Sequence, residues 1–113
     1  MHEYSVVQAL LNQCEEIAQE NSATKVTKVI CKIGIMSGIE THLLQVAFDT
    51  FKEKTICEDA KFVINIQKLK LECRDCGYIY EEDEVLYCCQ KCKSLKVKVI
   101  DGEDMYLMSL EMA

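Results

Sequence analysis

Cys73-Arg-Asp-Cys76-Gly-Tyr-Ile-Tyr-Glu-Glu-Asp-Glu-Val-Leu-Tyr-Cys-Cys89-Gln-Lys-Cys92 is the stretch that decides how the second half of this sequence folds. It contains two Cys-x-x-Cys pairs separated by twelve residues, and each pair can form a tight turn that directs two sulfurs toward one point. Two such turns facing each other supply four thiolates in a tetrahedron, which is the arrangement that Zn²⁺ prefers. Because four protein sulfurs leave no open coordination position, we expect Cys73, Cys76, Cys89 and Cys92 to hold a structural zinc ion.

Other interpretations of these cysteines stay open at this point. Two disulfides, or two reduced pairs without a metal, are compatible with the same pattern. A thiol–disulfide enzyme fits less well, since thioredoxin-like motifs place one Cys-x-x-Cys pair near a strand–helix–strand unit. Cys88 adjoins Cys89 and either thiol could reach a metal, although only Cys89 preserves the spacing. Gly77, directly after the first pair, suits the left-handed backbone that such a turn often needs.

The residues before the cysteine stretch predict a helix, a strand, a second helix and a second strand. The first helix is expected to begin at Ser5, because Ser5-Val-Val-Gln8 matches a capping box. Apolar residues then recur at helical spacing until Asn21. The later elements are a strand over residues 25–33 with Val29, Cys31 and Ile33 on one face, a helix with Leu43, Leu44, Ala47, Phe48 and Phe51 on one side, and a strand with Phe62, Ile64 and Ile66.

The last residues of the chain predict a strand that belongs to the first part of the fold. Residues 105–112 alternate as a strand, which we expect to join the sheet formed by the earlier strands. A strand–helix–strand order also predicts parallel pairing within that sheet. The expected fold is therefore α+β, with a small mixed β-sheet and two helices in a domain of residues 1–69 and 99–113. Residues 70–98 would form an inserted zinc-ribbon-like module with four cysteine ligands.

The composition limits the classes of partner. The formal net charge of −6 opposes non-specific binding to nucleic acid or to an anionic membrane. Eight cysteines, no signal peptide and no apolar run of membrane-spanning length fit a cytoplasmic protein in a reducing compartment. A zinc-ribbon module that binds proteins or nucleic acid is the alternative, and its support is a group of lysines around the last cysteine. These are Lys91, Lys93, Lys96 and Lys98.

The first three residues, Met1-His2-Glu3, are a second candidate metal site. The α-amine of Met1, the amide nitrogen of His2 and the imidazole of His2 can close two adjacent chelate rings around one ion. Nitrogen-rich, square-planar coordination favours Ni²⁺ or Cu²⁺. Glu3 can add its carboxylate or its backbone nitrogen. A frayed terminus without a metal is the alternative interpretation.

Several motifs are distributed along the whole sequence. Met1-His2-Glu3-Tyr4-Ser5 opens a helix, a Gly34-x-x-Ser37-Gly38-x-Glu40 turn follows the first strand, and Phe48-x-x-Phe51 lies in the second helix. Paired Cys-x-x-Cys motifs stand near the C-terminus. Taken together, these motifs resemble the HypA family of nickel metallochaperones, which act in hydrogenase maturation, and the resemblance covers nearly the whole chain. The sequence departs from the family at Thr41-His42, where Pro-Glu is frequent.

The resemblance implies a carrier rather than an enzyme. It implies that His2 is the essential nickel ligand, assisted by Glu3 and by the backbone nitrogens of the first residues, and that the four cysteines bind structural zinc. It implies delivery of the Ni²⁺ cargo to the large subunit of nickel–iron hydrogenase, together with a HypB-like GTPase and, in some bacteria, with service to urease through its accessory proteins. Apart from the resemblance, Glu40 is either a supporting residue of the nickel site or a helix-start carboxylate favoured by the helix dipole. His42 is either a helper ligand or an exposed helix residue.

Overall fold

The computed structural model describes residues 3–83 and 88–113, and the chain divides into two compact units. The first, here called the helical unit, comprises Met1–Lys32, Ile39–Asn65 and Tyr106–Ala113. The second, here called the cysteine unit, comprises Ile33–Gly38 and Ile66–Met105. In the part of the chain that is described, no helix is both long enough and apolar enough to cross a membrane.

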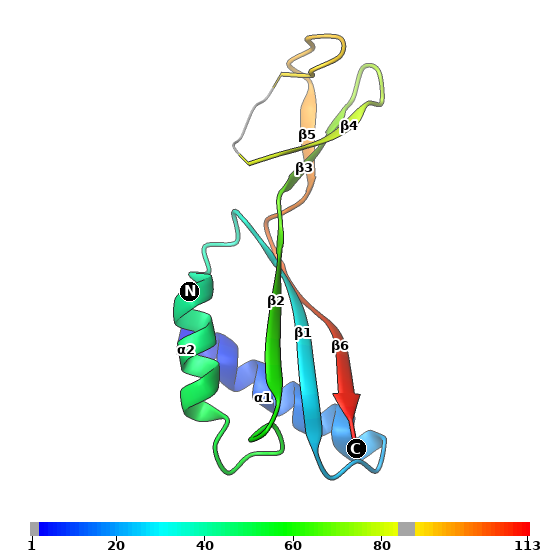
Figure 1. The fold of residues 1–113 in the computed structure, drawn as a ribbon. Helices are drawn as coiled ribbons and strands as arrows, with labels where there is room; N and C mark the ends of the chain where they lie inside the picture. Colours follow the sequence, from blue (N-terminus) through cyan, green and yellow to red (C-terminus); the bar gives the residue numbers. More distant parts are fainter. Residues whose placement is uncertain (1–2, 84–87) are drawn as a thin grey trace. The chain divides into compact units, whose positions relative to one another are not determined.

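Two helices and one sheet form the first part of the fold. The elements are α1 (Glu3–Glu20), β1 (Val26–Gly34), α2 (Thr41–Phe51), β2 (Lys61–Gln67) and β6 (Met105–Met112). The sheet has the strand order β2-β1-β6. Figure 1 shows β1 and β2 running in the same direction and β6 running opposite to them. The predicted mixed sheet with two helices is therefore confirmed.

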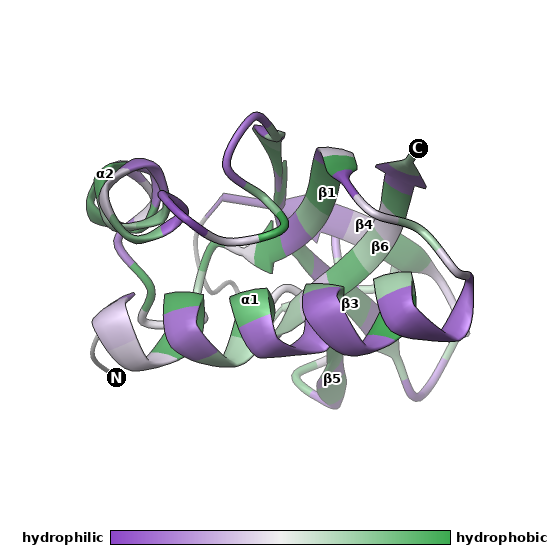
Figure 2. Cartoon of the chain, turned by 90° about the horizontal axis from the view of Figure 1, so that it is seen from below, coloured by the Kyte–Doolittle hydropathy of each residue, from purple (hydrophilic) through white to green (hydrophobic). Residues whose placement is uncertain are grey.

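The core of the helical unit lies between α1, α2 and the sheet. The apolar stripe of α1 is buried at Val7, Leu10, Leu11, Cys14 and Ala18. Figure 2 shows that the hydrophobic side of this helix faces the strands and that its hydrophilic side faces away. Helix α2 joins the same core through stacked rings, because the centroids of Phe48 and Phe62 lie 4.4 Å apart.

The start of α1 differs from the prediction. The helix begins at Glu3, so Ser5 lies inside it and is exposed, and the expected capping box at Ser5 and Gln8 is wrong. Gln8 instead donates a hydrogen bond to Asn12 one turn further along. A carboxylate in the first turn is stabilised by the positive end of the helix dipole, and Glu3 occupies that position.

The predicted apolar side of α2 is only partly buried. Leu44, Ala47 and Phe48 lie in the core, as expected. Leu43 is 51% exposed and Phe51 is 44% exposed. Leu43 lies at the edge of the apolar arc. Phe51 is the last residue of the helix and meets α1 through the ring of Tyr4, a contact that leaves much of its side chain exposed.

A second sheet forms the cysteine unit. Its strands are β3 (Leu69–Cys73), β4 (Ile79–Glu82) and β5 (Val97–Asp101), in the order β4-β3-β5 with both pairs antiparallel. Leu69, Leu71 and Tyr80 are buried together, and two valines of β5 pack against them. Such a small core gives little stability alone, so a bound metal would contribute directly to folding. The sequence between the two cysteine pairs also predicts a short strand over Val85-Leu-Tyr87, and these residues lie outside the described part of the chain.

Two glycines pass each other closely inside the cysteine unit. A Cβ atom on Gly34 would lie 2.2 Å from the carbonyl oxygen of Gly102. A Cβ atom on Gly102 would lie 2.7 Å from the carbonyl oxygen of Lys68, and its φ of +104° disfavours any L side chain. Gly38 also has a positive φ of 78°, but a Cβ atom at this residue would meet nothing within 4 Å. A side chain at Gly102 would meet both steric crowding and an unfavourable φ, whereas a side chain at Gly38 would meet only the unfavourable φ. Substitutions at these two glycines can therefore distinguish the two effects.

Replacing Gly102 by alanine is expected to lower the free energy of unfolding by at least about 3 kcal/mol, because backbone strain and a steric clash act together. The matched variant Gly38→Ala suffers only the unfavourable φ and should lose about 1 kcal/mol. Urea unfolding of the two zinc-loaded variants measures the difference. Equal losses in both variants would contradict the close approach at Gly102.

Candidate metal centres

The four cysteines of the two Cys-x-x-Cys pairs meet at one point of the cysteine unit. One sulfur from each of Cys73, Cys76, Cys89 and Cys92 lies within 4.8 Å of all the others. The Sγ atoms of Cys73 and Cys92 are 3.5 Å apart, and those of Cys76 and Cys89 are 3.6 Å apart. A tetrahedral zinc ion with Zn–S bonds of about 2.3 Å requires sulfurs separated by about 3.8 Å. The donor set and its spacing therefore fit Zn²⁺.

Each pair is shaped by a left-handed residue directly after its second cysteine. Gly77 has a φ of 75°, and its N–H donates to the carbonyl oxygen of Cys73 at 2.9 Å. Lys93 has a φ of 64° and donates in the same way to Cys89, also at 2.9 Å. The glycine was predicted from the sequence, whereas Lys93 was not, because a lysine carries no signal for this backbone conformation.

Backbone N–H groups prepare the first sulfur of each pair for metal binding. The N–H of Cys76 lies 3.5 Å from Sγ of Cys73, and it is the main cause of the lowered pKa of that thiol. The N–H groups of Cys92 and Lys91 lie 3.4 and 3.3 Å from Sγ of Cys89. The Cys92 N–H and then that of Lys91 lower the pKa of Cys89 to about 6, although burial opposes this. Cys89 is thus a thiolate at neutral pH, which is the form that binds metal.

The other cysteines stay outside this group of sulfurs. Cys88 is half-buried, and its Sγ lies near the carbonyl oxygens of Cys89 and Lys93, at 3.9 and 3.7 Å. Cys14, Cys31 and Cys57 are fully buried in the helical unit. Burial raises the pKa of Cys31 to about 12, so this thiol is protonated at neutral pH. Cys14 and Cys31 are buried as small hydrophobic side chains, in agreement with their positions in the apolar pattern.

All eight cysteines are free, and neither Cys-x-x-Cys pair begins a helix. The first pair starts at the last residue of β3, and the second precedes β5. Thiol–disulfide enzymes of the thioredoxin type rely on a helix start to activate the attacking thiol. The arrangement therefore favours a structural metal centre over redox catalysis.

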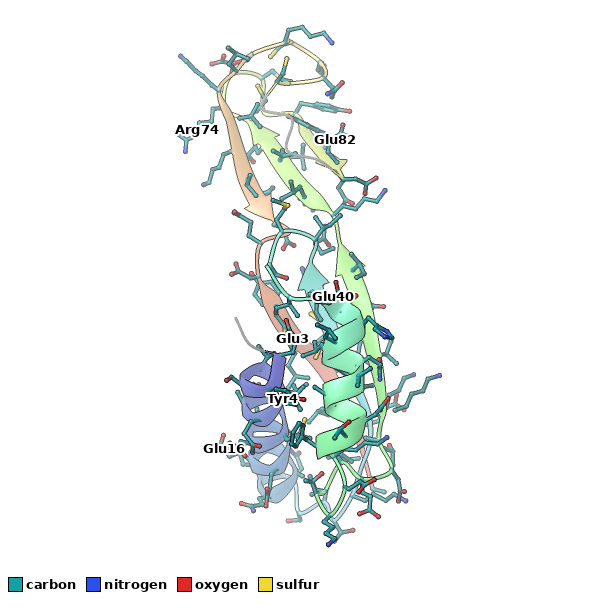
Figure 3. All side chains as sticks on the ribbon, turned by 90° about the vertical axis from the view of Figure 1, so that its left-hand side faces the viewer. Glu3, Tyr4, Glu16, Glu40, Arg74 and Glu82 are labelled. Atoms are coloured by element: carbon teal, nitrogen blue, oxygen red, sulfur yellow. The ribbon has the colours of Figure 1, made fainter. Side chains whose placement is uncertain are left out.

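At the start of α1, the structure brings together two acidic residues that are far apart in the sequence. Met1 and His2 lie outside the described residues. The carboxylate of Glu3 accepts a hydrogen bond from the backbone N–H of Glu40, at 3.3 Å. Figure 3 shows both residues at the N-terminal ends of their helices. Glu3, which directly follows Met1-His2 in the sequence, is thereby held at the beginning of α2.

Glu40 caps α2. Its backbone is extended, with φ −81° and ψ 108°, and its carboxylate accepts from the N–H of His42 at 3.0 Å. This is the helix-start arrangement expected of an acidic residue at that position. The side chain of His42 is exposed in the first turn of the helix. Glu40 thus links the cap of α2 to Glu3 through its backbone, a connection that sequence spacing does not reveal.

Comparisons with known proteins agree over nearly the full length. The family model described as "HypA: Hydrogenase/urease nickel incorporation, metallochaperone, hypA" matches residues 1–112. The chain is 50% identical to the hydrogenase maturation factor HypA of Aquifex aeolicus over 112 residues, which cover 99% of this chain and 97% of that protein. It is 52% identical to the protein of the same name from Shewanella halifaxensis, again over 99% and 97% of the two chains.

Two solved structures of HypA proteins also match this chain. The solution structure of the Ni metallochaperone HypA from Helicobacter pylori superposes with a TM-score of 0.71 at 41% identity, and the match covers 99% of this chain and 97% of that one. A second structure, described as the solution structure of HypA protein, matches with a TM-score of 0.77 at 42% identity, over 100% and 97% of the two chains.

Proposed function

The chain belongs to the HypA family, and we propose from this membership that it is a nickel metallochaperone for hydrogenase maturation. It binds Ni²⁺ at its N-terminus and hands the ion to a partner, without turning over a substrate. The observation that carries the proposal is the family match over residues 1–112, which includes both Met1-His2-Glu3 and the four-cysteine cluster. A cytoplasmic location fits the eight free cysteines.

The proposed nickel site uses nitrogen donors at the chain terminus. The Met1 amine, the His2 amide nitrogen and the His2 imidazole form adjacent chelate rings, and nitrogen-rich ligands favour Ni²⁺ over Mg²⁺ or Ca²⁺. Glu3 adds its carboxylate or its backbone nitrogen. Its hydrogen bond to the Glu40 N–H supports this role, because it ties the third residue of the site to the start of α2. Glu40 would then position the site rather than bind the metal.

Binding nickel for transport and releasing it to a partner require opposite properties of the nickel site. A carrier must bind the ion selectively, yet a partner must be able to displace its ligands one after another. Three adjacent residues at a terminus meet both demands, since their ligands can be removed in sequence without opening a folded core. The zinc centre differs in this respect, because four sulfurs surround the ion completely.

The four-cysteine cluster has a separate, structural role in this proposal. Zinc bound by Cys73, Cys76, Cys89 and Cys92 stabilises the module of residues 70–98, whose own core is small. The proposed recipients of the nickel are a HypB-like GTPase and the large subunit of nickel–iron hydrogenase. Urease, served through its accessory proteins, is a further recipient of the same kind.

The proposal predicts two metal ions with different lability. Native mass spectrometry of untagged protein, loaded with Zn²⁺ and Ni²⁺, should show one of each per chain. A short exposure to EDTA should remove the nickel and leave the zinc, because only the zinc is enclosed by four protein ligands. A tagged protein with extra residues before Met1 serves as the control and should retain only zinc. Failure of the untagged chain to bind Ni²⁺ at neutral pH would contradict the carrier function.

A further inference from the structure

The two helices carry an exposed apolar surface beside Glu3. We call it the helix patch and define it by Tyr4, Leu43, Val46 and Phe51, which are 64%, 51%, 48% and 44% exposed. The rings of Tyr4 and Phe51 meet edge to face, with centroids 4.9 Å apart. Single apolar residues are common on protein surfaces, but adjoining ones of this size mark binding surfaces.

Two shallow cavities border the Tyr4 ring. The first has a volume of about 190 Å³ and is lined by Glu3, Tyr4, Leu43, Val46, Ala47 and Thr50. The second has a volume of about 250 Å³ and is lined by Tyr4, Ser5, Gln8 and Phe51. Sites for small molecules and cofactors usually enclose about 300–1,000 Å³. These cavities suit individual apolar side chains that project from a partner helix.

The charged side chains within the two helices have one sign. None of the 13 lysines and arginines of the chain lies in α1 or α2. The nearest cation along the chain, Lys52, follows α2 and is paired with Asp49 at 3.6 Å. The acidic residues of the two helices and of the α2 cap are Glu3, Glu15, Glu16, Glu20, Glu40 and Asp49.

We propose that the helix patch docks a basic, amphipathic helix of a partner protein. Large apolar side chains of that helix enter the two cavities, and its lysines and arginines face the acidic residues of α1 and α2. Charge complementarity of this kind selects the partner and speeds its association. The inference rests on the proposed function, because Glu3 lines the first cavity and belongs to the proposed nickel site. A partner bound here lies beside the ion that it receives.

The variant Val46→Lys tests the surface, with Met108→Lys as its matched control. Val46 and Met108 are 48% and 56% exposed, and Met108 lies in β6, away from both cavities. In a strain whose own gene is deleted, Val46→Lys should reduce hydrogenase activity at least about tenfold. Its nickel affinity should stay within about twofold of wild type, since no proposed ligand changes. Met108→Lys should resemble wild type in both measurements.

The outcomes separate this inference from the function on which it rests. Full hydrogenase activity with Val46→Lys would overturn the docking surface and leave the nickel carrier intact. An equal loss with Met108→Lys would also overturn it, because any added surface lysine would then be sufficient. A wild-type chain that restores no hydrogenase activity would overturn the proposed function and this inference with it.

The chemistry of the partner is tested with two peptides of about 18 residues that share a leucine face and carry either lysine or glutamate elsewhere. The lysine peptide should shift the amide NMR signals of Tyr4, Leu43 and Val46, and should bind at least about tenfold more tightly than the glutamate peptide. Equal affinities for the two peptides would contradict a basic partner.

Light scattering tests whether a second copy of the chain occupies the helix patch instead. If the wild-type protein is a dimer and Val46→Lys is a monomer, the helix patch is a dimer interface and the proposal is overturned.

Discussion

Replacing His2 by alanine is expected to abolish high-affinity nickel binding. The imidazole closes one of the two proposed chelate rings, so its loss opens the site. Removing a group that only supports a metal ligand already costs about 10–100-fold in affinity. Loss of a ligand itself should therefore weaken Ni²⁺ binding by more than about 100-fold. Isothermal titration of untagged, zinc-loaded protein measures the change, and hydrogenase activity in a deletion strain should be lost in parallel.

The chain provides its own control, because His42 is its other histidine. The His42 side chain is exposed, and its backbone N–H, which caps onto Glu40, remains in the variant His42→Ala. His42→Ala should therefore bind nickel like wild type, whereas a helper ligand at this position would reveal itself as a weaker affinity. Glu3→Gln preserves an oxygen for the Glu40 N–H and should have a smaller effect than His2→Ala.

Lowering the pH should weaken nickel binding, as the removal of His2 does. The imidazole must be neutral to bind Ni²⁺, so binding should weaken as the pH falls through about 6.5. Nickel binding by His2→Ala that equals wild type, or that shows the same pH profile, would rule out the N-terminal site.

Replacing Cys89 by serine is expected to release the zinc and unfold the cysteine unit. Cys89 is fully buried, and two backbone N–H groups stabilise its thiolate, whereas a serine hydroxyl stays protonated at neutral pH and is a poor zinc ligand. Structural zinc contributes about 10 kcal/mol or more to folding in small domains. The buried group of Leu69, Leu71 and Tyr80 is too small to compensate for such a loss. Zinc analysis of the purified variant and its amide NMR spectrum measure the two effects.

Cys88→Ser is the matched control for this variant. Cys88 stands next to Cys89 but contributes no sulfur to the group of four. Its replacement should therefore keep one zinc per chain and leave the NMR spectrum folded. Zinc loss from Cys88→Ser together with zinc retention by Cys89→Ser would reverse the assignment of the ligand.

The same cluster should release zinc only in acid. The pKa of Cys89 is lowered to about 6, whereas the pKa values of Cys76 and Cys92 are raised, so protons compete with the metal more strongly for the latter two sulfurs. As the pH falls, protons displace Zn²⁺ from the four sulfurs and the stability that the metal confers is lost. Zinc content should therefore be constant near neutral pH and decrease at lower pH.

Part of the candidate site could be predicted from the sequence, because the residues involved lie close together in the chain. Cys73 and Cys76 are close in the chain, as are Cys89 and Cys92, so a tight turn alone brings each pair together. Gly77 was predictable for the same reason, since only its own φ is involved. The start of α1 was not predicted correctly. A capping-box match at Ser5 and a first-turn carboxylate at Glu3 overlap in the sequence and indicate different starts of the helix.

The remaining features depend on contacts between distant segments. The hydrogen bond from the Glu40 N–H to Glu3 joins residues 37 positions apart, and no periodicity encodes it. The crossing of Gly34 and Gly102 is likewise invisible until the strands are paired. Leu43 and Phe51 were predicted on the apolar side of the second helix, but an apolar side chain is buried only where another element covers it.

The amino-acid sequence was sufficient to predict the grouping of the four cysteines, the order of helices and strands in the helical unit, and the membership of the chain in its family. Ligand spacing and the periods of helix and strand are properties of short segments, so they can be read without knowing the fold. The exposure of apolar residues on α1 and α2, and the way in which Glu3 is held, became visible only in the folded chain. Burial and long-range hydrogen bonds are set by which surfaces meet, and that depends on the packing of the whole chain.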